Sequence, residues 1–459
     1  DEWGLTGFVV SDWLDIARLH SVHAIAETRK EADRLALSAG VDMHMHGGEF
    51  FDNVLALVRE GAISEARIDA AVLPILYAKF QLGLFERRYS EPARVRATLR
   101  CPAHLAVALE ASRKSLVLLT NTAGILPLRN VRSLCVTGPD ADDQSILGDW
   151  ARLQPAQNVV TVKQGLIAQA PSGVRVEYVA TGPIAQISDE QIAAAVKAAA
   201  QTDVTIVVIG ENSLRDNHER TSGENVDRAS LEPPGRQLEL VRALVATGKP
   251  IVAVLVNGAP IASEWLAEHA AAVLEAWEPG AFGGQAIAEA LFGQLNPSGR
   301  LPMTVPRSTG HLKNYYNHRP SAHHRGKYRF SSYEPLFRFG HGLSYTRFEY
   351  SQLRSRDELS AGEELVVEVD VKNAGARAGE DIVLLFVRDV FASVTRPVKE
   401  LRAFERVALE PGEKKTVRFV LGPEAFSLFD RQLKKTIEPG EFRLLIGLGG
   451  PEKSVWVTS

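Results

Sequence analysis

The sequence predicts a chain of mixed class, α/β over its first two thirds and all-β over its last quarter. Up to about residue 310, short apolar runs alternate with stretches long enough for helices, which is typical of parallel sheets with crossover helices. From about Tyr345 the apolar residues recur with period two and the long helical stretches stop, which is typical of an antiparallel sandwich. The two patterns therefore predict α/β structure followed by a β-sandwich.

Length and composition set the outer bounds. The 459 residues are too many for one ordinary core and indicate about two to four domains. With 45% apolar residues, 24% charged residues and a formal net charge of −4, the chain lacks the basic excess of nucleic-acid-binding proteins. No apolar run is long enough to span a membrane, so we expect neither nucleic acid nor membrane as a partner. Cys101 and Cys135 lack paired spacing, which argues against a zinc site or a disulfide framework.

Residues 1–87 contain two predicted strand–helix units. The runs "GFVVS" at 7–11 and "VDMHM" at 41–45 have the character of short buried strands, and a helical stretch follows each of them. Two strands can neither close a barrel nor form a parallel sheet that is buried on both faces. We therefore expect sequence before Asp1 to supply the neighbouring strands.

Residues 88–104 are polar and contain prolines, which indicates a linker to a second α/β block over 105–310. The apolar runs expected to form strands in that block are 115–121, 133–139, 174–180, 204–210, 250–258 and 271–277. Helical stretches such as 189–201 separate them, so we expect an open, mostly parallel sheet with helices on both faces. Ligands of such sheets bind beyond the carboxyl ends of the strands, where Glu211 follows one of the runs.

Residues 311–344 form a long irregular connector, and connectors of this length are usually functional or packed across a domain seam. Residues 345–459 then contain short alternating runs with turn signals between them. The runs expected to form strands are 364–375, 380–390, 399–409, 414–421 and 441–449. About seven short strands in this length predict an immunoglobulin-like or fibronectin-type sandwich.

Several motifs follow one another along the chain. They include "GFVVSDW", "KFQLGLF", "SLVLLTNTAGILPL", "ILGDW", "WEPGAFGGQAIAEALFGQLNPSGRLPMTVP", "FRFGHGLSYTRFEY" and "RPVKELRAFERVALEPGE". In these motifs and their order the chain resembles the C-terminal part of a glycoside hydrolase family 3 enzyme of the three-domain bacterial β-glucosidase type. The resemblance implies an incomplete (β/α)8 TIM barrel over 1–87, an α/β sandwich domain over 105–310 and a fibronectin type III-like domain over 345–459. The family residues that hold the nonreducing sugar belong to the part of the barrel before Asp1.

The resemblance places the catalytic nucleophile on Asp12. Retaining glycosidases use two carboxyl groups about 5–5.5 Å apart, one that attacks the anomeric carbon and one that acts as acid and then as base. An aspartate at the carboxyl end of a barrel strand suits the first role, and its alternative role is a helix N-cap. Trp13 is a candidate platform for a sugar ring, with ordinary packing at the barrel rim as the alternative. Asp15 is expected to be a cap or a solvated loop residue.

The second carboxyl group is expected in the loop 211–228, which is polar, rich in acids and follows a predicted strand. The family pattern, a glutamate four residues before an arginine, fits Glu224 with Arg228. Glu211 and Glu219 compete with it, and each of the three glutamates has the alternative of a solvated loop carboxylate. An acid that works near neutral pH needs a raised pKa, which we expect from partial desolvation when this domain docks against the barrel.

The histidines raise the separate hypothesis of a metal site. His44 and His46 lie on one face of a predicted strand, as a metal-binding pair would, but no third ligand occurs at suitable spacing. His323, His324 and His341 lie in the connector and are expected to pack at a domain seam. We expect neither a metal nor an organic cofactor.

The resemblance implies a retaining, exo-acting β-glucosidase that hydrolyses terminal nonreducing β-D-glucosyl residues. A β-xylosidase of the same family, and an inactive fragment without the sugar-binding half of the barrel, stay open as alternatives. The implied substrate is an oligosaccharide or an aryl or alkyl β-glycoside. A second copy of the chain, or a companion chain that completes the barrel, is the expected kind of protein partner. Relatives of this architecture are commonly periplasmic or secreted.

Overall fold

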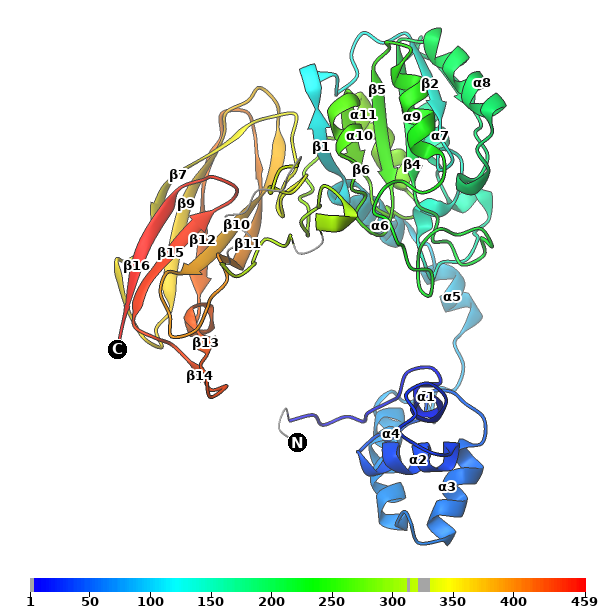
Figure 1. Cartoon of the computed structure of the whole chain (residues 1–459), viewed down its shortest axis with the longest axis vertical. Helices are drawn as coiled ribbons and strands as arrows, with labels where there is room; N and C mark the ends of the chain where they lie inside the picture. The colour runs from blue at the N-terminus through cyan, green and yellow to red at the C-terminus, as the bar shows by residue number, and fades with distance from the viewer. Residues whose placement is uncertain (1–3, 312–313, 321–330) are drawn as a thin grey trace. The chain divides into compact units, whose positions relative to one another are not determined.

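The computed structural model describes residues 4–311, 314–320 and 331–459, and the chain folds into two compact units, Asp1–Cys101 and Pro102–Ser459. Figure 1 shows that the first unit is helical and that the second contains an α/β domain and a β-sandwich. No helix of the described residues is long and apolar enough to cross a membrane.

The first unit is built from helices. They are Asp15–Ser21 (α1), Arg29–Ser38 (α2), Phe50–Arg59 (α3), Glu65–Gln81 (α4) and Pro92–Thr98 (α5). Thr28 and Ser64 are the N-caps of α2 and α4, because their hydroxyls accept hydrogen bonds from the N–H groups of Glu31 and Arg67. Helix α5 lies inside the segment predicted as a linker, so that segment is partly helical.

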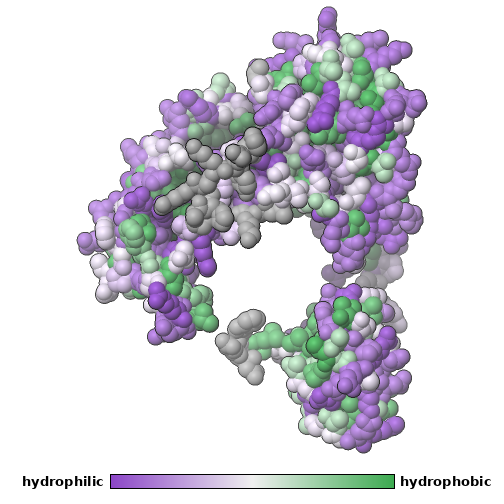
Figure 2. Space-filling model, viewed as in Figure 1, coloured by the Kyte–Doolittle hydropathy of each residue, from purple (hydrophilic) through white to green (hydrophobic). Residues whose placement is uncertain are grey.

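The two strands predicted in this unit are reduced to a single bridge. Val10 and Met43 pair in parallel, and the N–H of Ser11 donates to the carbonyl of Met43 at 3.0 Å. Val9, Val10 and Met43 are 41%, 43% and 40% exposed, and Figure 2 shows hydrophobic residues at the surface near the start of the described chain. The prediction of two full, buried strands is therefore wrong here. Two short parallel segments form few ladder bonds, and no third strand of the described residues pairs with them.

The α/β domain contains the six predicted strands in one sheet. They are Val117–Asn121 (β1), Ser133–Thr137 (β2), Arg175–Val179 (β3), Val204–Gly210 (β4), Ile251–Val256 (β5) and Ala272–Glu275 (β6). Their order is β1-β6-β5-β4-β2-β3, in which β1 runs antiparallel to β6 and all other neighbours are parallel. The predicted open, mostly parallel sheet is confirmed.

Helices cover both faces of this sheet (Figure 1). On one face lie Val162–Gln169 (α7) and Gly283–Phe292 (α11), and on the other lie Asp189–Ala200 (α8), Gln237–Val245 (α9) and Glu264–His269 (α10). Helix α6 (Pro102–Ser115) packs against α11. Every residue of β4 and β5 is buried, which explains why these strands are continuous apolar runs in the sequence.

The C-terminal domain is a two-sheet sandwich, as predicted. One sheet has the order β11-β10-β15-β16-β8 and the other β12-β9-β7. The strands are Phe348–Arg354 (β7), Glu358–Ser360 (β8), Leu365–Asn373 (β9), Gly379–Asp389 (β10), Glu400–Leu409 (β11), Lys414–Leu421 (β12), Gly440–Ile446 (β15) and Glu452–Thr458 (β16), with a hairpin of Leu428–Phe429 (β13) and Lys435–Thr436 (β14). Buried apolar side chains from both sheets form one core. The sequence pattern does not predict β7, β8 and β16, which are short or only partly buried.

A buried ion pair joins the two domains of the second unit. Arg300, beyond α11, pairs with Asp381 of β10, and Tyr350 of β7 donates a hydrogen bond to the same carboxylate. Asp381 is only 1% exposed, so water screens the pair much less than it screens a surface pair. Breaking a buried pair from one side leaves an uncompensated charge, so loss of either partner is expected to be destabilising.

The predicted connector over 311–344 contacts both of these domains. Nε2 of His341 lies 2.8 Å from a backbone carbonyl oxygen of β1, and the hydroxyl of Tyr316 accepts a hydrogen bond from a backbone N–H of β11 at 3.3 Å. The described part of the connector is therefore packed across the domain seam. The other two connector histidines singled out from the sequence, His323 and His324, lie outside the described residues.

Candidate active site

The polar loops of the second unit meet at the carboxyl edge of the α/β sheet. Asp149 and Trp150 lie beyond β2, the loop 211–228 follows β4, and Glu278 follows β6. The carboxyl ends of parallel strands lie at one edge of a sheet, which is why segments so far apart in sequence converge. The three candidate glutamates of the loop 211–228 have different surroundings at this edge.

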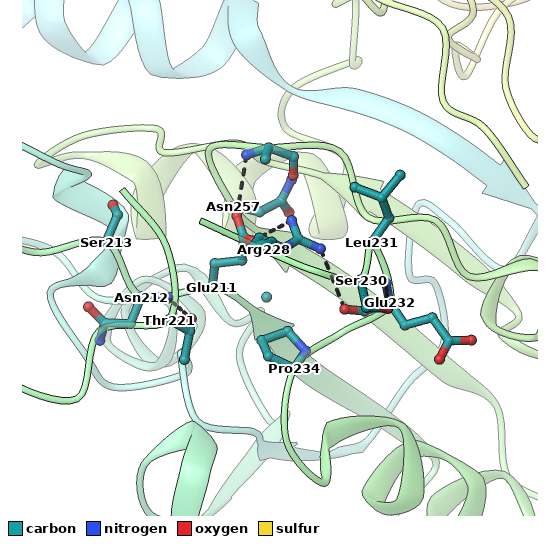
Figure 3. Close-up of polar contacts among 12 residues, drawn as sticks. Glu211, Asn212, Ser213, Thr221, Arg228, Ser230, Leu231, Glu232, Pro234 and Asn257 are labelled. Carbon is teal, nitrogen blue, oxygen red and sulfur yellow. Dashed lines mark hydrogen bonds and ion pairs between the residues drawn. The ribbon is translucent and has the colours of Figure 1, made fainter. Parts of the chain in front are cut away.

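Glu211, at the start of the loop, belongs to the domain interior. Its buried side chain forms an ion pair with Arg228, and its Oε2 accepts a hydrogen bond from the N–H of Ala259 at 3.3 Å. Figure 3 shows Arg228 reaching from Glu211 toward the backbone of Glu232. Burial raises the pKa of Glu211, against the opposing effect of the Arg228 guanidinium. This glutamate therefore holds the two ends of the loop together.

Glu224, near the other end of the loop, is exposed. Its carboxylate pairs with Arg215, and half of its side chain is accessible to solvent. Its N–H donates to Oδ2 of Asp149 at 2.6 Å, which fixes the backbone beneath the carboxyl group. The next residue, Asn225, has a left-handed φ of 63°. Glu224 thus offers a carboxyl group that is both held in place and reachable from outside.

Arg215 connects Glu224 to a second carboxylate and to an aromatic ring. Its Nε lies 2.8 Å from Oδ1 of Asp149, and its guanidinium lies 4.1 Å from the ring centre of Trp150, which is 74% exposed. Burial acts to raise the pKa of Asp149, but the N–H groups of Glu224 and Trp150 and the guanidinium of Arg215 hold it below its usual value. An exposed indole beside a held carboxyl group suits the binding of a sugar ring.

Glu219, the third candidate, faces a different neighbour. Its Oε1 accepts a hydrogen bond from Nε2 of Gln186 at 2.5 Å, and its N–H donates to Oδ1 of Asn217 at 2.9 Å. Of the three glutamates, only Glu224 takes part in the network with Arg215. The arginine four residues after Glu224 in the family pattern, Arg228, pairs with Glu211.

In the first unit, Asp12 follows the parallel bridge and is exposed. Its Oδ1 accepts a hydrogen bond from the N–H of Trp13 at 2.7 Å. It is not the N-cap of α1, because Leu14 occupies that position and makes no side-chain capping bond. Asp15 is the first residue of α1 and forms an ion pair one turn further along the helix. The Asp12 carboxyl group therefore does not act as a helix N-cap, which was its alternative role.

Trp13 lies flat against His46, with ring centres 3.6 Å apart and planes 4° from parallel, and 53% of it remains exposed. His44 stacks in the same manner on Phe50, with 4.4 Å between ring centres. Each histidine of the predicted pair is thus packed on its own aromatic partner. Among the described residues, no group of three His, Cys, Asp or Glu side chains is arranged to hold a metal ion.

Asp149, Trp150 and Arg215 are residues of this edge that were not predicted from the sequence. A signal for the first two was present, because "ILGDW" follows a predicted strand of the same sheet as the loop 211–228. The part played by Arg215 had no such signal. Its contacts depend on how the loop folds back on itself, which no local pattern specifies.

Family models match most of the chain. Residues 116–345 match the glycosyl hydrolase family 3 C-terminal domain, residues 1–78 match the glycosyl hydrolase family 3 N-terminal domain, and residues 381–449 match the fibronectin type III-like domain. The chain belongs to glycoside hydrolase family 3. The resemblance and the fold class inferred from the sequence are confirmed, and the four predicted domain limits stay predictions.

Relatives within family 3 include both glucosidases and xylosidases. The chain is 37% identical over 467 residues to a β-xylosidase of Formosa agariphila, with 97% of this chain and 63% of that protein covered. It is 37% identical over 487 residues to the periplasmic β-glucosidase of Salmonella typhimurium, with 98% of this chain and 62% of that protein covered. The family 3 chain thus spans less than two thirds of the length of these relatives.

Solved family 3 structures share the fold over the whole chain. A β-glucosidase from Erythrobacter marinus has a TM-score of 0.91 and 38% identity, and the match covers 100% of this chain and 64% of that one. The β-glucosidase of Listeria innocua, solved with isofagomine, has a TM-score of 0.91 and 36% identity, and the match covers 99% of this chain and 64% of that one.

Proposed function

We propose that this family 3 chain carries the catalytic pair of a retaining, exo-acting β-glycosidase that acts on β-glucosides. The observation that supports it most strongly is the surroundings of Glu224: an exposed carboxyl group whose backbone is bonded to Asp149, beside the exposed ring of Trp150. The β-glucosidases among the relatives and solved structures support the same reaction class.

In the proposed mechanism Asp12 is the nucleophile and Glu224 is the acid and base. Asp12 attacks the anomeric carbon and forms a glycosyl ester while the bond to the leaving oxygen breaks, and Glu224 gives that oxygen its proton. Water then adds to the anomeric carbon, loses a proton to Glu224 and releases the sugar, which restores the Asp12 carboxylate. Trp13 and Trp150 offer exposed indole faces for sugar rings.

The proposed substrate is an oligosaccharide with a terminal nonreducing β-D-glucosyl residue, or an aryl or alkyl β-glucoside. A β-xyloside is the second candidate, because a β-xylosidase is as similar to this chain as the Salmonella β-glucosidase, at 37% identity. The two sugars differ by the exocyclic hydroxymethyl group, so the choice depends on the space around that carbon.

Hydrolysis of chromogenic substrates tests the proposal. The 459-residue chain is assayed with matched aryl β-glucoside and aryl β-xyloside, together with the variant Asp12→Asn, which keeps the shape of the side chain and removes the nucleophile. We expect turnover of the glucoside in excess of the xyloside and its loss in the variant. Absence of turnover by the folded chain would support the inactive-fragment alternative, and a faster xyloside would support the second candidate.

A further inference from the structure

Glu278 is a half-buried carboxyl group with no part in the proposed reaction, and it lies beneath the segments that hold Glu224. It follows β6 by three residues and sits at the carboxyl edge of the sheet. Its Oε1 accepts a hydrogen bond from the hydroxyl of Ser213, in the loop 211–228. The backbone N–H of Asp149, in the segment beyond β2, lies near the same carboxyl group and acts to lower its pKa.

Two glycines leave room for this carboxyl group. A Cβ atom on Gly148 would overlap Oε2 of Glu278, and one on Gly258 would lie 3.2 Å from its Oε1. Gly148 precedes Asp149, and Gly258 follows β5. Segments after β2, β4 and β5 therefore all pass within contact of one side chain, which comes from the segment after β6.

Only one further residue separates Glu278 from Glu224. Asp149, which follows the Gly148 that packs against Glu278, accepts the N–H of Glu224 at 2.6 Å and pairs with Arg215. A Cβ atom on Gly223 would lie 2.8 Å from Oδ2 of Asp149, so the chain before Glu224 lies close against that carboxylate. A displacement at Glu278 thus reaches the Glu224 backbone through Asp149.

A residue with a left-handed backbone conformation lies next to each carboxyl-bearing residue in this series of contacts. Trp150, Asn225 and Trp277 have φ of 60°, 63° and 57°, and each is the immediate neighbour of Asp149, Glu224 or Glu278. Left-handed residues other than glycine persist where the surrounding contacts fix them. The contacts of Glu278 are among those that keep this arrangement.

We propose that Glu278 is a positioning residue, which fixes Ser213 and Asp149 and through them the backbone of Glu224. The inference rests on the proposed role of Glu224 as acid and base. Burial raises the pKa of Glu278, opposed by the Ser213 hydroxyl and reinforced by the Asp149 carboxylate. A neutral amide therefore fits the same place, and Glu278→Gln is the conservative variant.

Residue-resolved amide hydrogen exchange of the 459-residue chain tests the positioning without any need for activity. We expect Glu278→Ala to speed exchange of the Glu224 and Asp149 amides by about tenfold, which corresponds to loss of a hydrogen-bonded anchor. Glu278→Gln should stay within about threefold of the parent chain. Glu268→Ala, at an exposed site in α10, is the matched control and should leave both amides unchanged. Unchanged exchange in Glu278→Ala would overturn the proposal.

Two additions keep the test decisive. If Glu278→Ala does not fold, Ser213→Ala removes one donor to Glu278, and faster exchange at Glu224 supports the proposal whereas unchanged exchange overturns it. In an active chain, Glu278→Ala should lower kcat, whereas Glu278→Gln should keep kcat near that of the parent chain. Added azide should not restore the activity of Glu278→Ala. Azide rescue would make Glu278 the acid itself and overturn the positioning role. Unchanged activity in a Glu224 variant would instead refute the proposed function. The exchange result does not depend on that function.

Discussion

Glu211 and Glu224 lie thirteen residues apart in one loop, yet their surroundings are opposite. Glu211 is 2% exposed and paired with Arg228, whose own side chain is only 10% exposed, whereas Glu224 keeps half of its side chain in solvent. Both carboxylates have an arginine partner, so pairing alone does not distinguish them. Burial does, and it indicates that Glu211 stabilises the fold while Glu224 is available for chemistry.

The largest expected effect is on catalysis at Glu224. Glu224→Ala should lower kcat/KM for a substrate with a poor leaving group by about 10²–10⁴-fold, because a general acid contributes that much when the leaving oxygen needs a proton. Activated aryl glucosides should be affected less, and added azide should restore turnover. The free energy of unfolding should change by less than about 0.5 kcal/mol, as for an exposed site. Equal losses on both substrates would contradict the assignment.

Substitution of Glu211 should have its main effect on the stability of the fold. Glu211→Ala leaves the buried guanidinium of Arg228 without its partner, and we expect a loss of about 3–5 kcal/mol in the free energy of unfolding, measured by urea denaturation. In a double-mutant cycle, the second substitution Arg228→Met should recover part of that loss, because no buried charge is then unpaired. A loss below about 1 kcal/mol would mean that the pair is not part of the interior.

A smaller effect, on pH dependence, sharpens the contrast between buried and exposed carboxyl groups. Glu275 at the end of β6 is buried, and burial raises its pKa to about 8 from 4.5, against hydrogen bonds from Trp277 and Asn257 and with Glu211 adding to the rise. The folded state therefore keeps a proton that the unfolded chain loses near pH 4.5. The contribution of the protonated Glu275 carboxyl group to the free energy of unfolding is complete below pH 4.5. It is lost as the pH rises to about 8.

Glu275→Gln tests that sign. Relative to the parent chain, the variant should gain about 4 kcal/mol in the free energy of unfolding between pH 4.5 and pH 8, because its amide cannot ionise. Glu268→Gln, at an exposed site in α10, is the matched control and should change the free energy of unfolding by less than about 0.5 kcal/mol at either pH. A constant difference between Glu275→Gln and the parent chain across this range would show that Glu275 does not hold a proton.

The sequence predicted best the strands that are buried along their whole length. The runs that became β4 and β5 are continuous and apolar because helices cover both faces of their sheet, and the pattern alone shows it. The run at 7–11 has the same character but forms only the bridge from Val10, since a strand also needs partners on either side. The domain limits at 87, 104, 310 and 344 stay predictions.

The candidate site was predictable only in part. Asp12, Trp13 and Glu224 came from family motifs, each a short stretch of sequence. Arg215 and Glu278 were out of reach, because their contacts join segments after different strands of the sheet. The burial of Glu211 could not be predicted either, because the sequence of its loop is polar throughout. Residues that act through tertiary contacts leave no local pattern.

Trapping of the covalent intermediate tests whether Asp12 is the nucleophile. The 459-residue chain is incubated with an activated 2-deoxy-2-fluoro-β-D-glucoside, whose fluorine slows breakdown of the glycosyl ester, and is then examined by intact-mass and peptide mass spectrometry. We expect a single added fluoroglucosyl group on the peptide that contains Asp12, and none in Asp12→Asn. A label on another carboxyl group, or no label on a folded chain, would contradict it.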